Sequence, residues 1–434
     1  MINVGDRSKQ SLDNLINTIG RFTFLLNGKK RFFNGVVKFD DERIIIQCEV
    51  PVAVLPDLQG RYSVIGRIKN VPVSFYQARE KRCWKQTRTS KKTKALVDFT
   101  FSYAVIGYGK IEEMRVAKIH LYSSELNAFF PLVRSSELRE EDILKSLVEL
   151  KANDEFEKVV IGQTLAYQYS RKGSTTHIYT YISCSFDVPL EIPAAVARVA
   201  SIRNLLTFFC CRYIGLVNLT VTDPSHSRGI RNYREYVLIY NYNEHPDEHI
   251  DRFFISGMMI EKTFSQVINE WCKFETKAHP ITALFYGIVS GNTTWINDYL
   301  NIAQAIEVYS ARFRRSVIRQ ALGISKKERI TLKHRIEDLL TLYSHFYSIS
   351  DISALSQKLS DARNFYTHYD KDKKEPTDEE LYCSIQILRS ILLLVIYKCI
   401  GLSDETIAQA RLFGFMKSFN GYCEFLLGEE TEKS

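Results

Sequence analysis

The first part of the chain alternates apolar and polar residues with a period of two, which is typical of half-buried antiparallel strands. The pattern predicts strands in the segments FTFLL near Phe22, FFNGVVKFD, RIIIQCEV, ALVDFTFSYAVIGYG and MRVAKIHLYS, with residues 40–42 as the turn between the second and the third. A hairpin is predicted next, because KVVIGQTLAYQYS and THIYTYISCSFDV flank a turn at residues 171–174 that contains Gly173. Residues 1–190 are therefore expected to form a β-sandwich or a barrel.

The periodicity changes to helical spacing after this region. Pro193 stands where a first-turn proline is tolerated, and AAVARVASIRNLLTFFCCRY carries apolar residues three and four apart. Two further strands, LVNLTV and REYVLIYNY, precede a helical region that opens near Gly257. Residues 191–290 are therefore predicted to be a mixed α/β connecting segment that packs on the N-terminal domain.

From residue 291 onward the pattern is wholly helical. The predicted helices are TTWINDYLNIAQAIEVYSARFRRSVIRQAL, ERITLKHRIEDLLTLYSHFY, SALSQKLSDARNFYTHY and LYCSIQILRSILLLVIYKCI, which ends at Gly401. Four antiparallel helices with short connections form a bundle. The expected fold is thus α+β and multidomain, with a β-rich domain at 1–190, a mixed segment at 191–290 and an all-α bundle at 291–434.

Composition and charge narrow the class of protein. A chain of 434 residues is too long for one ordinary core, and its net charge of +8 favours acidic partners such as nucleic acid or an anionic membrane surface. The nine cysteines include no CxxC pair, which suits free thiols in the cytoplasm. No signal peptide is apparent, and the uninterrupted apolar runs fall short of the roughly 20 residues that span a bilayer. We expect a cytoplasmic protein that has no membrane partner.

Candidate chemistry is concentrated in DARNFYTHYD, near the end of the third predicted bundle helix. Arg363 is followed by Asn364 and, after four intervening residues, by His368. An arginine followed by a histidine after four or five intervening residues recurs at Arg115 and His120, Arg171 and His177, and Arg329 and His334, so spacing alone does not select the pair. The first of these recurrences lies in a predicted strand, the second in a turn, and the third at a helix start followed by an apolar residue.

The residue types in this motif suit the cleavage of RNA. A histidine side chain titrates near neutral pH and can move a proton to or from ribose oxygens, while arginine donates to phosphate oxygens as charge accumulates. On a regular helix Arg363 and His368 lie about 140° apart, so one chain presents them awkwardly to one phosphate. Asn364 and His368 share a face, where a hydrogen bond would fix the imidazole.

The motif, the preceding helix with Glu307 in QAIEVYSARFRR, and the apolar last helix ending in KCIGLSD resemble an ApeA-like HEPN domain, and the β-rich part is similar to the region that precedes it. The resemblance implies a prokaryotic anti-phage, abortive-infection protein whose HEPN homodimer cuts RNA, with transfer RNA as a candidate. It implies catalysis by Arg363, Asn364 and His368 through 2′-OH transesterification, with no metal or cofactor. A phage-derived trigger sensed by the β-rich domain is also implied.

Two basic clusters are candidates for RNA binding. The first is an expected loop before the strand ALVDF that contains Arg82, Trp84 and Lys85 among Arg79, Lys81, Arg88, Lys91, Lys92 and Lys94. It either grips phosphates while Trp84 stacks on a base, or is simply a solvated loop. The second is Lys371, Lys373 and Lys374 directly after the motif, which either guides RNA into the cleft or is a charged connection between helices.

Several alternatives stay open at this point. Glu307 either supports the bundle beside the cleft or is an ordinary surface carboxylate. The spacing of His245 and His249 suits a metal site, but Pro246 predicts a loop, and no metal is expected there. The sequence contains no Gly-rich phosphate loop, GxSxG or HExxH motif. The rival functions are a non-catalytic HEPN module for RNA binding or dimerisation, and the toxin of a toxin–antitoxin pair.

Overall fold

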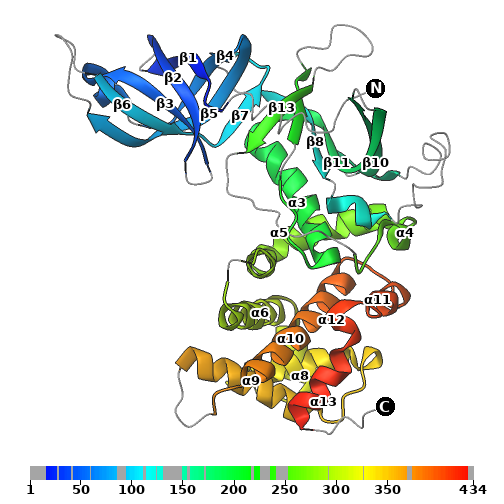
Figure 1. Cartoon of the computed structure of the whole chain (residues 1–434). Helices are drawn as coiled ribbons and strands as arrows, with labels where there is room; N and C mark the ends of the chain where they lie inside the picture. Colours follow the sequence, from blue (N-terminus) through cyan, green and yellow to red (C-terminus); the bar gives the residue numbers. More distant parts are fainter. Residues whose placement is uncertain are drawn as a thin grey trace. The chain divides into compact units, whose positions relative to one another are not determined.

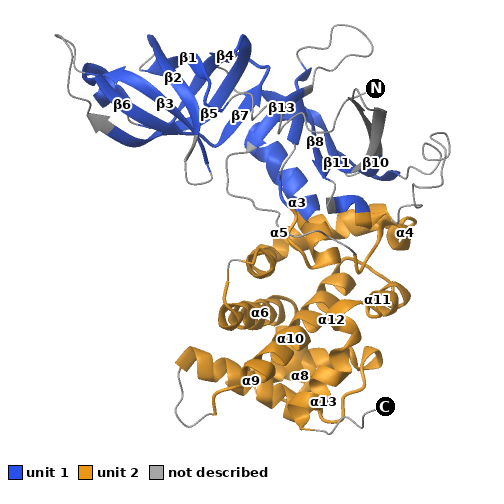
Figure 2. Ribbon diagram, in the orientation of Figure 1, with its two compact units in different colours: residues 1–127, 132–203, 215–249 blue, residues 128–131, 204–214, 250–434 orange. Residues whose placement is uncertain are grey.

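A computed structural model of the chain describes residues 16–26, 29–40, 43–58, 60–85, 94–110, 114–123, 125–130, 149–153, 157–170, 173–216, 219–224, 235–240, 253–291, 293–325, 327–368 and 374–428 (Figure 1). Contacts divide the chain into two compact units (Figure 2). The first comprises residues 1–127, 132–203 and 215–249, and the second comprises residues 128–131, 204–214 and 250–434. Residues 191–290 thus contribute to both units, and a separate connecting domain there stays a prediction.

The first unit contains a closed antiparallel β-barrel. Its strands are β1 (Ile19–Leu26), β2 (Lys29–Asp40), β3 (Arg43–Pro51), β4 (Tyr62–Ile68), β5 (Val71–Lys85) and β6 (Lys94–Thr100). They pair in the order β4-β1-β2-β3-β6-β5, and β4 also pairs with β5, which closes the ring. Closure leaves none of these strands with a fully open edge. Of the two expected architectures, sandwich and barrel, the structure contains the barrel.

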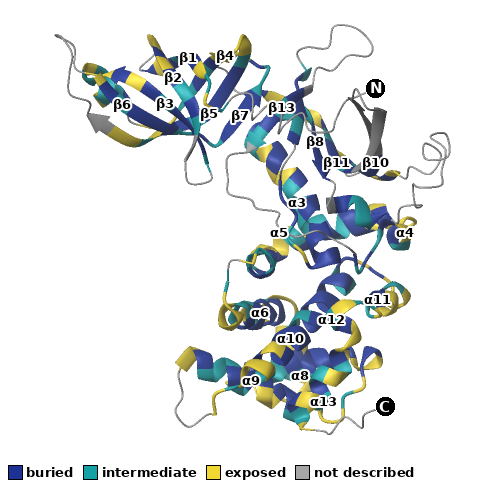
Figure 3. Ribbon diagram, viewed as in Figure 1, coloured by how far each residue is buried: buried dark blue, intermediate teal, exposed yellow. Residues whose placement is uncertain are grey.

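The interior of the barrel is aromatic and explains the period-two pattern. Buried and exposed positions alternate along β1, and Figure 3 shows the same alternation on the neighbouring strands. Phe22, Phe24 and Phe99 are fully buried, and the rings of Phe24 and Phe99 lie 4.9 Å apart. Gly66 pairs with Phe22 across β4 and β1, where a Cβ would stand 2.8 Å from the Phe22 ring. The close approach of this ring requires a glycine.

The sheet continues beyond the barrel. Its outer strands are β7 (Tyr103–Ile106), β8 (Arg115–Ser123), β9 (Glu149–Asn153), β10 (Glu157–Ser170), β11 (Gly173–Glu191), β12 (Leu219–Thr222) and β13 (Glu235–Tyr240), joined in the order β7-β13-β12-β8-β11-β10-β9. The predicted hairpin is confirmed as β10 and β11, and their pairing reaches Ser170 opposite Gly173. The segment predicted as one strand, ALVDFTFSYAVIGYG, divides into β6 and β7.

The second unit is helical. After the long helix α3 (Ile192–Cys210), which begins in the first unit, its helices are α4 (Gly257–Ile260), α5 (Phe264–Val289), α6 (Trp295–Tyr309), α7 (Arg315–Ala321), α8 (Leu332–Leu342), α9 (Ile352–His368), α10 (Asp378–Cys399), α11 (Asp404–Ala410), α12 (Gly414–Lys417) and α13 (Phe419–Leu427). Helix α10 contacts α6 and α13, and α8 contacts α9. The four-helix prediction was incomplete, because α5 and α13 also pack against its members.

Helix α10 is the core of this unit, with buried residues on all sides from Ile385 to Tyr397 except at a half-buried Arg389. It ends before Gly401, which has a φ of 81°. By length and composition alone, α3 and α10 are long and apolar enough to cross a membrane. The expectation from the sequence considered only apolar runs without a charged residue, and for that reason it did not single out these two helices. Within α10, 83% of the apolar window is buried, as expected for the core helix of a bundle.

The predicted helix of residues 293–322 is not continuous. A π-helical turn, η4 (Ser310–Arg314), separates α6 from α7, and Arg314 leaves helical geometry with φ −127° and ψ 2°. A π-turn inserts one extra residue, so the residues after it face a different direction than a regular helix would give them. The pattern of apolar residues does not reveal this shift.

Candidate active site

Helix α9 carries the candidate catalytic residues as the sequence predicts. It is held by the buried residues Leu355, Leu359 and Tyr366, which recur at helical spacing on the face toward the bundle. Arg363 is half-buried, whereas His368 is the exposed last residue of the helix. Because α9 is helical through His368, the two side chains leave it about 140° apart.

Arg363 is paired with Glu307 from α6. Arg363 Nη2 lies 3.5 Å from Glu307 Oε1, and the two side chains are 23% and 30% exposed. On the backbone of the same glutamate, the Glu307 carbonyl accepts a hydrogen bond from Arg335 Nη1 of α8 at 2.8 Å. Glu307 therefore joins three helices beside Arg363. Of the two alternatives left open by the sequence, the one that supports the bundle near the motif is confirmed.

A buried tyrosine fixes the position of α6 against α9. The Tyr299 hydroxyl donates a hydrogen bond to the Leu359 carbonyl, and its ring lies 6.3 Å from that of Tyr366. Burial raises the pKa of Tyr299 far above the ordinary value for tyrosine, so the hydroxyl keeps its proton and stays a donor. This contact sets the register that brings Glu307 to Arg363.

Asn364 and His368 are not hydrogen-bonded to each other. Although they lie four residues apart on one face of α9, the side chains of both lack a hydrogen-bond partner among the residues that the structure describes. The expected fixing of the imidazole by Asn364 is therefore not seen. Half-buried Asn364 and exposed His368 both leave polar groups available to a ligand or to another chain.

The other Arg–His pairs stand in different structural settings. In β8, Arg115 forms an exposed ion pair with Glu191 at 3.2 Å, and burial lowers the pKa of His120 to about 3, so this histidine is neutral. His334 caps the start of α8, where its Nδ1 accepts from the Thr331 amide. The helix begins at Leu332, so Arg329 precedes it. His177 lies in β11, and Arg171 falls outside the described residues.

The predicted RNA-binding residues differ in their placement. Arg82, Trp84 and Lys85 were expected in a loop, but they lie in strand β5, where they pair with β6 opposite Asp98, Leu96 and Ala95. Cross-strand pairing fixes their backbone, so the solvated-loop interpretation is wrong for them. The side chains of Trp84 and Lys85 lie outside the described residues, as do Lys371 and Lys373. Lys374 is exposed before α10.

No group of three potential metal ligands occurs among the residues that the structure describes. His245 and His249 fall outside those residues. All nine cysteines are free thiols.

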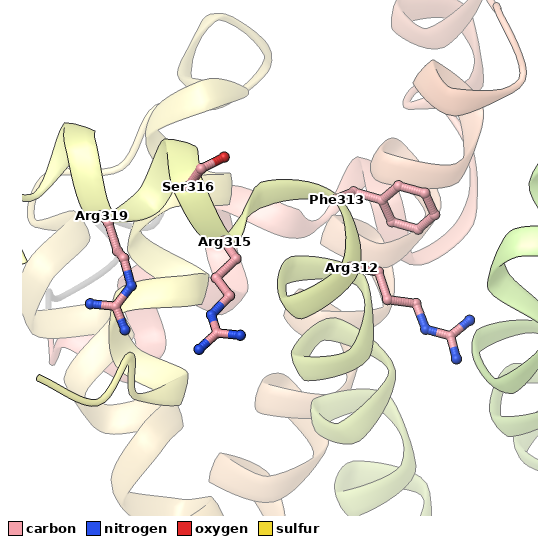
Figure 4. A pocket seen from close by; sticks show the side chains of 5 residues that line it. All are labelled: Arg312, Phe313, Arg315, Ser316 and Arg319. Atoms are coloured by element: carbon pink, nitrogen blue, oxygen red, sulfur yellow. The ribbon is translucent and has the colours of Figure 1, made fainter. Parts of the chain in front are cut away.

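Sequence reasoning missed one basic segment of the helical unit. Residues 310–335 contain nine lysines and arginines and a single acidic residue, Glu328. Arg312, Arg315 and Arg319 of this segment line a pocket of about 500 Å³ together with Phe313 and Ser316 (Figure 4). Counting the net charge in successive stretches of the sequence would have found this segment. The hydrophobic periodicity does not reveal it, because charged residues at helical spacing look like an ordinary polar face of a helix.

Comparison with known families shows which family the chain belongs to. Residues 300–406 match the Apea-like HEPN family, and residues 17–271 match ApeA N-terminal domain 1. The chain belongs to the ApeA family. The HEPN match includes Glu307, Arg363 and His368, and ApeA-like HEPN domains are associated with ribonuclease activity in defence. HEPN domains typically dimerise and act on RNA. Searches of curated proteins and of solved structures gave no match.

Proposed function

We propose that this ApeA family member is a metal-independent endoribonuclease of prokaryotic anti-phage defence that cuts RNA with Arg363 and His368. The observation that carries the proposal is the contact of Arg363 with Glu307, on the helix that the HEPN family match covers. One nitrogen of the guanidinium faces the carboxylate, and its other donors are left for a phosphate. His368 on the same helix supplies an exposed imidazole.

The chemistry assigned to these residues is transesterification. The His368 imidazole removes the proton from a ribose 2′-OH, and the 2′-oxygen attacks the adjacent phosphorus while the bond to the 5′-oxygen breaks. The departing 5′-oxygen takes a proton from a water molecule, and the hydroxide left behind regains one from the imidazolium, while Arg363 donates to the phosphate oxygens that gain negative charge. The products are a 2′,3′-cyclic phosphate and a 5′-OH. DNA, which lacks the 2′-OH, is not a substrate.

The arginine and the histidine of one site come from two copies of the chain. The angle of about 140° between Arg363 and His368 keeps one helix from presenting both to one phosphate. Two α9 helices related by a two-fold axis bring the histidine of one copy toward the arginine of the other. Asn364, which has no hydrogen-bond partner among the described residues, is then available to orient an imidazole across the seam.

In this proposal the β-rich unit senses a phage-derived trigger or restrains the nuclease, and cleavage of host or phage RNA in the cytoplasm stops phage production. Transfer RNA is the candidate substrate, because its loss halts translation. In a HEPN bundle that only binds RNA or dimerises, His368 would have no chemical role. Substitution of His368 therefore distinguishes a nuclease from a non-catalytic module.

Arg363→Ala and His368→Ala are each expected to reduce cleavage of total RNA by roughly a hundredfold or more, because each removes a group that acts in the transition state. Cleavage by the unaltered protein is expected to persist in EDTA and to leave cyclic phosphate ends. The measurement is gel-resolved cleavage with mapping of the termini, and circular dichroism establishes that both variants are folded.

His279→Ala is the matched control, because His279 is an exposed histidine of the same helical unit. It is expected to cleave RNA at the unaltered rate. The proposal fails if a folded His368→Ala chain cleaves as fast as this control, or if EDTA abolishes cleavage.

A further inference from the structure

One short segment of the helical unit carries a net positive charge as large as that of the whole chain. Residues 310–335 carry nine basic residues and one acidic residue, so their net charge of +8 equals that of the whole chain. The remaining residues balance to zero. The excess of basic over acidic residues in this segment lies in η4, α7 and the start of α8. It is therefore a local feature of these elements.

The π-turn distributes these charges between the interior and the surface. Arg314 turns inward, where Nε and Nη2 donate to the two carboxylate oxygens of Asp338 at 2.5 and 2.8 Å. Arg312 and Arg315 are exposed on either side of it, and Arg319 follows one turn later. Figure 4 shows the guanidinium groups of Arg315 and Arg319 pointing the same way from α7. Arg314 is thus neutralised, whereas exposed Arg312 and Arg315 and half-buried Arg319 line a pocket.

The arginines that line the pocket are not neutralised by carboxylates in the described part of the chain. Arg312 donates to the Lys277 carbonyl, and Arg319 donates to the carbonyls of Ser325 and Glu328, which orients both groups without removing their charge. Arg315 and Arg329 have neither a hydrogen bond nor an ion pair among the residues that the structure describes. The charges of Arg315 and Arg329 therefore do not stabilise the fold through an ion pair in the described part of the chain. They are available to a partner outside the chain.

The basic surface continues to the candidate catalytic arginine. Burial lowers the pKa of Arg335, and the nearby charges of Arg315 and Arg329 lower it further, against the opposing effect of Glu307. Arg335 Nε is buried and has no hydrogen-bond partner in the described part of the chain. Arg335 Nη1 donates a hydrogen bond to the Glu307 carbonyl, while the Glu307 carboxylate forms an ion pair with Arg363. One glutamate therefore links the catalytic arginine to a cluster of like charges.

We infer that Arg315, Arg319 and Arg329, with Arg335 behind them, form a binding site for the sugar–phosphate backbone of single-stranded RNA, next to the phosphate that is cut. The ligand is taken to be RNA because the proposed function is RNA cleavage, so the inference rests on that proposed function. Backbone contacts of this kind hold a strand in place and do not select its sequence. Phe313 in the same pocket is 39% exposed and offers a ring face to a base.

The test is RNA binding by full-length chains that all carry His368→Ala, so that cleavage does not interfere. Arg315→Gln with Arg329→Gln removes two charges that have no partner in the described structure, so folding is not at stake. The matched control is Lys262→Gln with Lys417→Gln, two exposed lysines of the same helical unit without a recorded ion pair. Fluorescence anisotropy of a labelled single-stranded RNA is measured across a range of salt concentrations.

The arginine pair is expected to weaken binding roughly tenfold near physiological salt and to lower the slope of log K against log salt by about 1.4, which is about 0.7 for each lost phosphate contact. The control is expected to change the affinity less than twofold. Equal affinities of the two double variants would overturn the inference and leave an acidic protein as the partner of this surface.

The inference and the proposed function fail in different ways. If the unaltered chain does not cleave RNA but the arginine pair still weakens binding, the proposed function is wrong and the RNA site stands. If cleavage occurs but the arginine pair binds as the control does, the nuclease stands and the site is wrong.

Discussion

At the scale of single residues, the contact between Glu307 and Arg363 is what separates the motif from a coincidence of spacing. Their atoms are 3.5 Å apart on two different helices, and both side chains are partly shielded from water. A carboxylate at this position limits the directions that the guanidinium can take. We therefore propose that Glu307 is a positioning residue, which acts on the phosphate only through Arg363.

Glu307→Ala is expected to lower kcat for RNA cleavage roughly tenfold, because a catalytic group displaced by a fraction of an ångström loses its alignment. Glu307→Gln keeps an oxygen that accepts from Arg363 and is expected to retain most of the rate. KM is expected to change little in both variants. Steady-state kinetics on one RNA check this, and a Glu307→Ala chain with unaltered kcat contradicts the assigned role.

At the scale of the elements, the π-turn and its ion pair with α8 orient the arginines that are proposed to bind RNA. Arg314 and Asp338 are 16% and 4% exposed and make two hydrogen bonds. Hydrogen bonding to this carboxylate raises the pKa of Arg314 above its ordinary value, so the group stays charged. The pair anchors η4 on α8, and the direction of Arg315 and Arg319 follows from that anchor.

Asp338→Asn is expected to destabilise the helical unit by about 3 kcal/mol, because it leaves the half-buried Arg314 charge without its counter-ion. Glu270→Gln, which breaks the exposed pair with Lys273, is expected to cost less than about 1 kcal/mol. Urea unfolding of the full chain measures both values. Equal effects of the two substitutions would show that the buried pair contributes no more than a surface pair.

Sequence patterns predicted the elements with strong periodicity and missed those that tertiary contacts decide. The alternation around Phe22 predicted β1, and the helical spacing through Leu359 predicted α9 with its motif. The charged residues from Arg79 to Lys85 looked like a loop, because cross-strand pairing with β6 is not visible in local composition. The role of Glu307 depended on how α6 packs against α9, which no local pattern encodes.

At the scale of the whole molecule, the chain joins a barrel-containing β unit to a HEPN-type helical unit. The ApeA N-terminal domain 1 match covers residues 17–271, and the HEPN match covers residues 300–406. The order of the two parts and the class of each were predictable from the change in periodicity. The pairing that closes β4 onto β5 was not, because strand neighbours far apart in sequence leave no local pattern. The proposed nuclease site extends beyond one chain, so it depends on assembly.

The central claim, that two chains build one site, is tested most directly with tagged heterodimers purified after co-expression. A dimer of an Arg363→Ala chain with a His368→Ala chain retains one site with both residues intact, so it is expected to cleave RNA at roughly half the unaltered rate. A dimer of an unaltered chain with a chain carrying both substitutions loses one residue from each site and is expected to be inactive. The reverse result, an inactive first dimer and a half-active second one, would contradict the claim and assign the site to a single chain.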